Sequence, residues 1–271
     1  MIDWQRMARP QADGYDTEQI IPLALERYGW TKTPPAPGVT AWAGGTVAIL
    51  EAVDAQSEHI TPAPTDHAHV ARADEIFRDV WPEMYAQAQG LLQSVTVYFD
   101  DRSGIFPLQT GCSCGPLAER VSFEMSTTIN GALGMLEGVV HEMGHSKLKP
   151  MGVSMYHWER LVANLHPTAE AIASGVGAHL YKSPIRKDKL RPIGACFSAH
   201  YSYLHVCELL HRVVRAGVVP FATLEAWIDV MHGRIRAGEA LVEEHLESTH
   251  EGLLFFLATT DWANELLAFE A

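Results

Sequence analysis

The second half of the chain is patterned almost continuously for helix. After Asn130, apolar residues recur at three- and four-residue spacing, the period of a helix that buries one face. Prolines interrupt this pattern, and a proline inside a helix removes a backbone hydrogen bond. We therefore expect helices over residues 131–148, 155–180, 192–216, 220–246 and 248–270. A chain with this pattern must fold mainly by packing helix on helix.

The first half mixes helical and strand-like patterns. Helical spacing predicts helices over residues 15–30, 46–56 and 67–92, the last bent or split by Pro82. Residues 95–99 (VTVYF) are β-branched and aromatic, which predicts a strand, and residues 120–125 alternate in the same way and are its expected partner.

These patterns together predict a mainly α fold. We expect one helical domain, residues 1–271, with a small antiparallel β element just before the helix over 131–148. The segment 31–45 is rich in proline and glycine, so it is the best candidate for an internal boundary.

Composition limits the partners and the compartment. The chain has 271 residues and a net charge of -13, with 33 Asp and Glu against 20 Lys and Arg, so it repels phosphate backbones and nucleic acid is not an expected partner. Residues 1–10 carry Asp3, Arg6 and Arg9 with no apolar run behind them, so we expect no secretory signal. No stretch approaches the ~20 apolar residues that span a bilayer. Four cysteines are too few for a disulfide scaffold. We expect a cytoplasmic protein with reduced thiols and no membrane contact, of open oligomeric state.

Residues 141–145 read His-Glu-Met-Gly-His within a strongly apolar helical segment. Helical spacing places His141 and His145 one turn apart on the same face, where two imidazoles can bind one divalent ion. Glu142 lies about 100° further round the helix and points beside such an ion. This pattern indicates a metal-dependent enzyme.

Spacing alone leaves several kinds of protein open. In a zinc peptidase with this motif, Glu142 would act as general base, and a downstream Glu159 or Glu170 could be the third ligand. The Gly-x-x-His continuation of metzincins is absent after His145. A third possibility is a binding module that keeps the helix but has lost the metal.

A longer stretch carries a family resemblance. The run HEMGHSKL, followed some thirty residues later by LYKSPIRKDKLRPIGACFSAHYSYLHVCELL, resembles the HExxH-type 2-oxoglutarate-dependent peptide β-hydroxylases that modify ribosomally made peptides. The resemblance covers about 70 residues, from His141 to roughly Leu210. The matching positions after the first motif are Lys147, Leu148, Tyr181, Pro184, Arg186, Asp188, Arg191, Pro192, Ile193, His200 and Tyr203.

The resemblance implies an iron enzyme that hydroxylates the β-carbon of a side chain in a ribosomal precursor peptide. Fe(II) would be held by His141, His145 and His200, with open positions for 2-oxoglutarate and dioxygen. A guanidinium would grip the 2-oxoglutarate carboxylate, with Arg191 the first choice and Arg186 the second. Glu142 would then orient a ligand or the substrate. A second alignment register places Ser198 at the position of His200.

Overall fold

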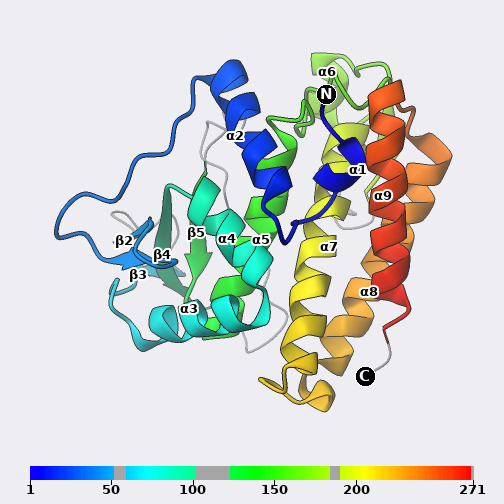
Figure 1. Ribbon diagram of the computed structural model, residues 1–271. Helices are drawn as coiled ribbons and strands as arrows, with labels where there is room; N and C mark the ends of the chain where they lie inside the picture. Colours follow the sequence, from blue (N-terminus) through cyan, green and yellow to red (C-terminus); the bar gives the residue numbers. More distant parts are fainter. Residues whose placement is uncertain (52–58, 102–122, 184–189, 270–271) are drawn as a thin grey trace.

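A small β-sheet and a group of long helices meet along one central helix, α5 (Ala132–Leu148) (Figure 1). The computed structural model describes residues 1–51, 59–101, 123–183 and 190–269. The prediction of a mainly α fold with a small β element before α5 is confirmed.

The sheet is mixed, and its centre is parallel. Strand β4 (Ser94–Asp100) lies between β2 (Val47–Glu51) and β5 (Glu124–Thr128), and both neighbours run parallel to it. Antiparallel pairs occur where β1 (Ala41–Trp42) joins β2 and where β3 (Ile60–Pro62) joins β4. The strands predicted at 95–99 and 120–125 correspond to β4 and β5, which run parallel to each other; the antiparallel pairing expected of the β element occurs at β1–β2 and β3–β4. The chain between β4 and β5 is long enough for the crossover that parallel strands require.

Two predicted helices are wrong. Residues 46–56 were expected to be helical, but Val47–Glu51 form β2, whose first three residues are all buried. A short apolar run buried on both faces carries no strand alternation, so its period cannot be told from that of a helix. Residues 155–180 contain only the short helix α6 (Ala169–Ser174). Pro167 interrupts this stretch just before α6, and a proline there is incompatible with a continuous helix.

The remaining helices of the N-terminal half agree closely with the predictions from the sequence. A short α1 (Trp4–Met7) precedes α2 (Tyr15–Tyr28), which ends at Gly29 in the left-handed conformation with φ of 65°. The predicted break at Pro82 separates α3 (Ala68–Val80) from α4 (Pro82–Leu91). Pro82 occupies the first position of α4, where its missing N–H costs nothing.

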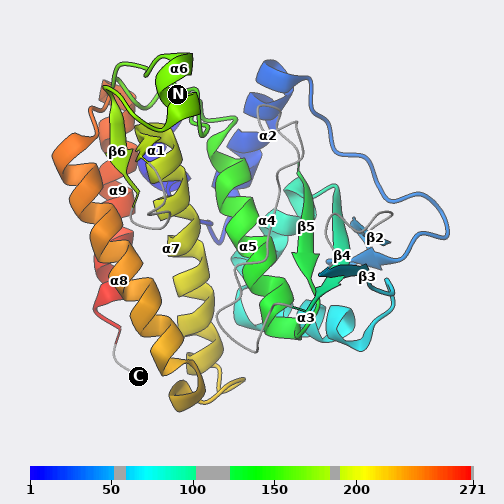
Figure 2. The same ribbon diagram turned by 180° about the vertical axis from the view of Figure 1, so that it is seen from behind.

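Three long helices complete the fold, as predicted. They are α7 (Ile193–Arg215), α8 (Phe221–His245) and α9 (His250–Leu267). A hairpin of β6 (Leu180–Lys182) and β7 (Leu190–Pro192) leads into α7. Figure 2 shows α7 running beside α5 on one side and α8 on the other.

Two glycines let α5 approach its neighbours on both sides. A Cβ added at Gly138 would lie 2.2 Å from Thr127 Oγ1 of the sheet. A Cβ added at Gly144 would lie 2.8 Å from the Cα of Ser202 on α7. Any larger residue at either position would separate the helix from its support, so these glycines set how deeply α5 is buried.

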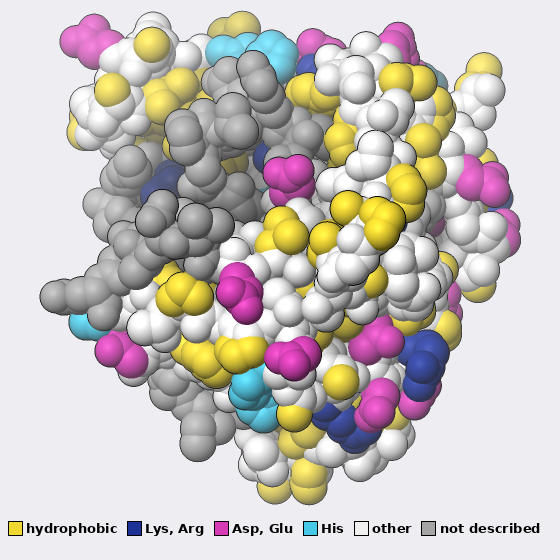
Figure 3. Space-filling view, turned by 90° about the vertical axis from the view of Figure 1, so that its left-hand side faces the viewer, with side chains coloured by type: hydrophobic (Ala, Val, Ile, Leu, Met, Phe, Trp, Pro, Cys, Tyr) yellow, Lys and Arg dark blue, Asp and Glu magenta, His cyan; other side chains and the backbone are white. Residues whose placement is uncertain are grey.

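One continuous apolar core, reaching from Trp4 to Leu266, joins the sheet side and the helical side. None of the helices in the described ranges has the length and hydropathy needed to span a bilayer. On the sheet side of the molecule, acidic side chains are scattered among hydrophobic and other surface atoms (Figure 3).

Candidate metal centre

His141 and His145 face each other on α5. Their Nε2 atoms are 3.1 Å apart, and their rings meet edge to face with centroids 4.7 Å apart. Two nitrogens that bind one ion at ~2.1 Å lie about 3.0–3.4 Å apart at coordination angles of ~90–110°. The predicted pair is therefore brought together with the separation that a shared metal ion requires.

Ser198 on α7 orients the second of these rings. Its Oγ lies 2.7 Å from His145 Nδ1. If Nδ1 carries the proton and donates it to this hydroxyl, Nε2 keeps a free lone pair toward His141. Metal-binding histidines commonly have such a partner on the far ring nitrogen, because it fixes the tautomer and the ring orientation.

Both imidazoles are kept neutral. Desolvation lowers the pKa of His141, although the nearby Glu142 carboxylate opposes this. Desolvation also lowers the pKa of His145 well below its usual value; the charge of Lys149, and a proton on His141 or His205, would act in the same direction. A neutral imidazole is the form that binds a metal, so both rings are competent ligands at neutral pH.

Glu142 lies beside the pair and is 3% exposed. Its Oε2 is buried and has no hydrogen-bond partner within the described residues. A buried carboxylate oxygen without a partner is costly, so an unpaired one beside two histidines is consistent with a ligand, water or ion that the protein binds there.

Arg234 of α8 approaches the centre from the other side. Its guanidinium carbon lies 4.7 Å from the centroid of the Tyr203 ring, and the Tyr203 ring lies 5.1 Å from that of His141. The charge of Arg234 lowers the pKa of His141, which places it within electrostatic reach. Its Nη1 is buried with no hydrogen-bond partner among the described residues. This guanidinium is therefore poised to bind an anion next to the histidines.

Glu137 lies one turn before His141 on α5. Burial raises the pKa of Glu137 to about 8, although the charge of Arg234 opposes the rise. The carboxyl is therefore largely protonated at neutral pH, and it does not neutralise Arg234 as an ionised carboxylate would.

The structure does not bring His200 to the pair. Its Nε2 is 2.7 Å from Oε1 of Glu239 on α8, and its ring packs against Gly238. Two residues along a helix correspond to a turn of about 200°, so Ser198 faces α5 while His200 faces α8. In the described ranges, no third His, Cys, Asp or Glu joins His141 and His145 in a group whose ligand atoms lie within 4.8 Å of one another.

Of the two arginines predicted to bind the 2-oxoglutarate carboxylate, only Arg191 lies in the described part of the chain. Arg191 lies on β7 opposite Tyr181, and its Nε is buried without a hydrogen-bond partner in the part of the chain that is described. Arg186 lies outside the described residues. The downstream candidate Glu159 is bound to Arg27 at 2.6 Å and is half-exposed, and Glu170 is exposed in the first turn of α6.

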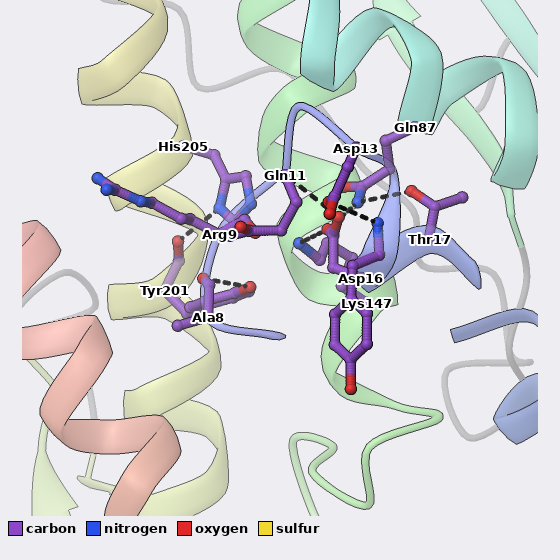
Figure 4. A network of polar contacts seen from close by, with 11 residues as sticks. Ala8, Arg9, Gln11, Asp13, Asp16, Thr17, Gln87, Lys147, Tyr201 and His205 are labelled. Carbon is purple, nitrogen blue, oxygen red and sulfur yellow. Dashed lines mark hydrogen bonds and ion pairs between the residues drawn. The ribbon is translucent and has the colours of Figure 1, made fainter. Parts of the chain in front are cut away.

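A buried polar network holds the end of α5 that follows His145 (Figure 4). Lys147 Nζ lies 3.0 Å from Oδ2 of Asp16, and both side chains are almost fully buried. Gln87 of α4 also donates to Asp16. The charge of Asp16 opposes the lowering that desolvation imposes on the pKa of Lys147. The network ties α5 to α2 and α4 and so fixes the helix that carries the histidines.

Sequence reasoning missed Arg234 and could not rank Ser198 above His200. Arg234 is one of two closely spaced arginines on an amphipathic helix, a pattern typical of a solvated face.

In sequence comparisons, no family model matches the chain, and no curated protein matches it.

Proposed function

We propose that this protein is an Fe(II)- and 2-oxoglutarate-dependent oxygenase that hydroxylates a side-chain β-carbon of a ribosomal peptide. The observation that carries the proposal is the pair of neutral imidazoles with Nε2 atoms 3.1 Å apart. Close by, the buried Nη1 of Arg234 has no hydrogen-bond partner among the described residues. The sequence resemblance from His141 to Leu210 supports the same reaction.

Each residue of the centre would have a separate role. His141 and His145 would hold the iron, and Ser198 would hold the His145 ring in place. Arg234 would bind the distal carboxylate of 2-oxoglutarate, a role for which a fixed guanidinium is suited. It replaces Arg191 as our first choice because it is linked to His141 through the Tyr203 ring. Glu142 would orient the peptide or a bound water.

Iron bound by these residues would supply the oxidising power for a reaction in which one atom of dioxygen would enter the substrate C–H bond, the other would enter succinate, and the keto acid would lose carbon dioxide. The chain itself would bind and orient the iron, the keto acid and the substrate. The buried rings of Tyr203 and Trp227 beside Arg234 would limit the entry of water.

The test is anaerobic titration of the purified protein with Fe(II) and 2-oxoglutarate. We expect a weak visible charge-transfer band that saturates with both components. Arg234→Met should weaken 2-oxoglutarate binding at least about tenfold, as expected for loss of a charge-assisted contact. Arg236→Met removes an exposed charge from the same helix and should leave binding unchanged. No band in the wild type would contradict the proposal.

One observation favours a second candidate, a zinc peptidase. The Oε2 atom of Glu142 is buried beside the histidines with no partner among the described residues, as a general base for metal-bound water would be before water binds. In that case the zinc-loaded protein cleaves peptides, Glu142→Gln abolishes cleavage, and 2-oxoglutarate has no effect. Failure of the wild type to cleave any member of a peptide library would remove this candidate.

A further inference from the structure

A second group of metal-binding side chains lies further along α7. Cys207 and His211 are four residues apart on α7, and His232 faces them from α8. All three are buried, with exposures of 0%, 1% and 8%. His200 and His211 are eleven residues apart on α7, about three helical turns, and both are directed at α8.

The separations in this group match those of ligands around one ion. The Nε2 atoms of His211 and His232 are 3.1 Å apart, and Cys207 Sγ is 3.5 Å from His211 Nε2. A sulfur at ~2.3 Å and a nitrogen at ~2.1 Å from one zinc ion lie roughly 3.6 Å apart at a tetrahedral angle. All the ligand atoms lie within 4.8 Å of one another.

Hydrogen bonding alone satisfies this group poorly. His211 Nε2 faces both Cys207 Sγ and His232 Nε2, but an imidazole nitrogen carries either one proton or one lone pair. His211 Nε2 therefore cannot form a well-aligned hydrogen bond with both neighbours. A cation at the centre would accept a lone pair from all three atoms at once.

We propose that Cys207, His211 and His232 form a second metal site, selective for Zn²⁺. One thiolate and two imidazoles are borderline-soft ligands that suit zinc, whereas the paired histidines of α5 offer nitrogen alone. The two sites are separate, because Ser198 and Cys207 are nine residues apart on one helix, about 14 Å at ~1.5 Å per residue. This inference does not depend on the reaction proposed for the first site.

The surroundings would hold the ligands and admit the ion. The Phe269 ring stacks on that of His211 at 3.8 Å between centroids, and the backbone of Leu266 forms a hydrogen bond with His232. His211 also lines a cavity of about 660 Å³, which gives an ion a route to the group; Glu208 and Glu265 in its wall are paired with Arg212 and Arg9. Three protein ligands leave a fourth tetrahedral position for water or another ligand.

Cobalt substitution tests the site in the full-length protein. After removal of metal under reducing conditions, Co(II) is added, because a cobalt–thiolate bond gives a strong near-ultraviolet charge-transfer band. We expect the band in the wild type, in the His141→Ala/His145→Ala double variant and in Cys196→Ser, and its loss in Cys207→Ser. No band in the wild type at saturating Co(II), or an unchanged band in Cys207→Ser, would overturn the proposal.

Zinc content gives a second measurement that does not need the cysteine variant to fold. His232→Gln should retain one equivalent of zinc less than the wild type after dialysis, while His245→Gln, on the same helix, should match the wild type. Equal zinc in His232→Gln and the wild type would contradict the site. Loss of metal from the α5 histidines alone would leave the cobalt band in place, so failure of one site is distinguishable from failure of the other.

Discussion

The Nε2 atoms of His141 and His145 lie 3.1 Å apart, and Ser198 holds the far nitrogen of the second ring. This arrangement joins two helices, because the histidines belong to α5 and the serine to α7. The metal-binding geometry therefore depends on the crossing of these helices as well as on the motif.

Ser198→Ala should weaken metal binding without unfolding the protein. Removing the partner of a ligating histidine typically costs about 10–100-fold in metal affinity, because the ring loses its fixed tautomer and orientation. Ser202→Ala is the matched control, since that hydroxyl donates to the Ala199 carbonyl. Competition with a chelator measures both affinities. Equal affinities for Ser198→Ala and the wild type would show that the hydroxyl does not position His145.

Lys147→Met should destabilise the fold strongly. It leaves Asp16, which is 1% exposed, without its cationic partner in the core, and breaking a buried pair in this way costs about 3–5 kcal/mol. Adding Asp16→Asn should recover part of the loss. Arg72→Ala, which breaks the exposed Arg72–Glu75 pair, should cost less than ~1 kcal/mol. Urea denaturation measures each value, and a small effect of Lys147→Met would show that the pair contributes little.

Gly144→Ala should destabilise the crossing of α5 and α7. The new Cβ would lie 2.8 Å from a backbone atom of Ser202, and overpacking of this kind costs about 1–3 kcal/mol. The same substitution at Gly233 on α8, where an added Cβ would meet no described atom within 4 Å outside the helix's own backbone, should stabilise the protein by up to ~1 kcal/mol. Thermal melts of the two variants should therefore shift in opposite directions. A shift in the same direction would contradict the close contact.

Glu137→Gln should change how stability depends on pH. The folded-state pKa of Glu137 is about 8 and the ordinary value is 4.5, so the folded protein holds a proton that the unfolded chain releases between these values. The stability gained from this proton is complete below the ordinary pKa and is lost as pH rises toward about 8, at up to ~1.4 kcal/mol per pH unit.

The free energy of unfolding measured at several pH values gives this contribution as the difference between wild type and variant. The wild type should lose more stability than Glu137→Gln between pH 5 and about pH 8. Glu225→Gln, at an exposed position of α8, should follow the wild type. Parallel curves for the wild type and Glu137→Gln would contradict the raised pKa.

The sequence predicted what depends on neighbours along the chain. The facing of His141 and His145 follows from helical spacing alone, and the break at Pro82 follows from the chemistry of proline. The same is true of the long helices α7, α8 and α9.

The features that the sequence did not predict depend on contacts between distant segments of the chain. Whether Ser198 or His200 faces α5 is decided by how α7 packs, and Gly144 sets that packing. Arg234 reaches the centre from a helix almost 90 residues later. The strand β2 was predicted as a helix because its short apolar run does not show the alternation of a half-buried strand.

Fe(II) binding by the full-length protein under anaerobic conditions shows whether His141 and His145 hold a metal ion. The Cys207→Ser background removes the proposed second site, so that only the α5 site is titrated. We predict one equivalent of bound Fe(II). His141→Ala and His145→Ala should each lose at least about 100-fold in affinity, because losing a ligand costs more than the ~10–100-fold effect of losing a ligand's hydrogen-bond partner. Unchanged Fe(II) binding in both histidine variants would contradict the claim that these two rings hold a metal ion.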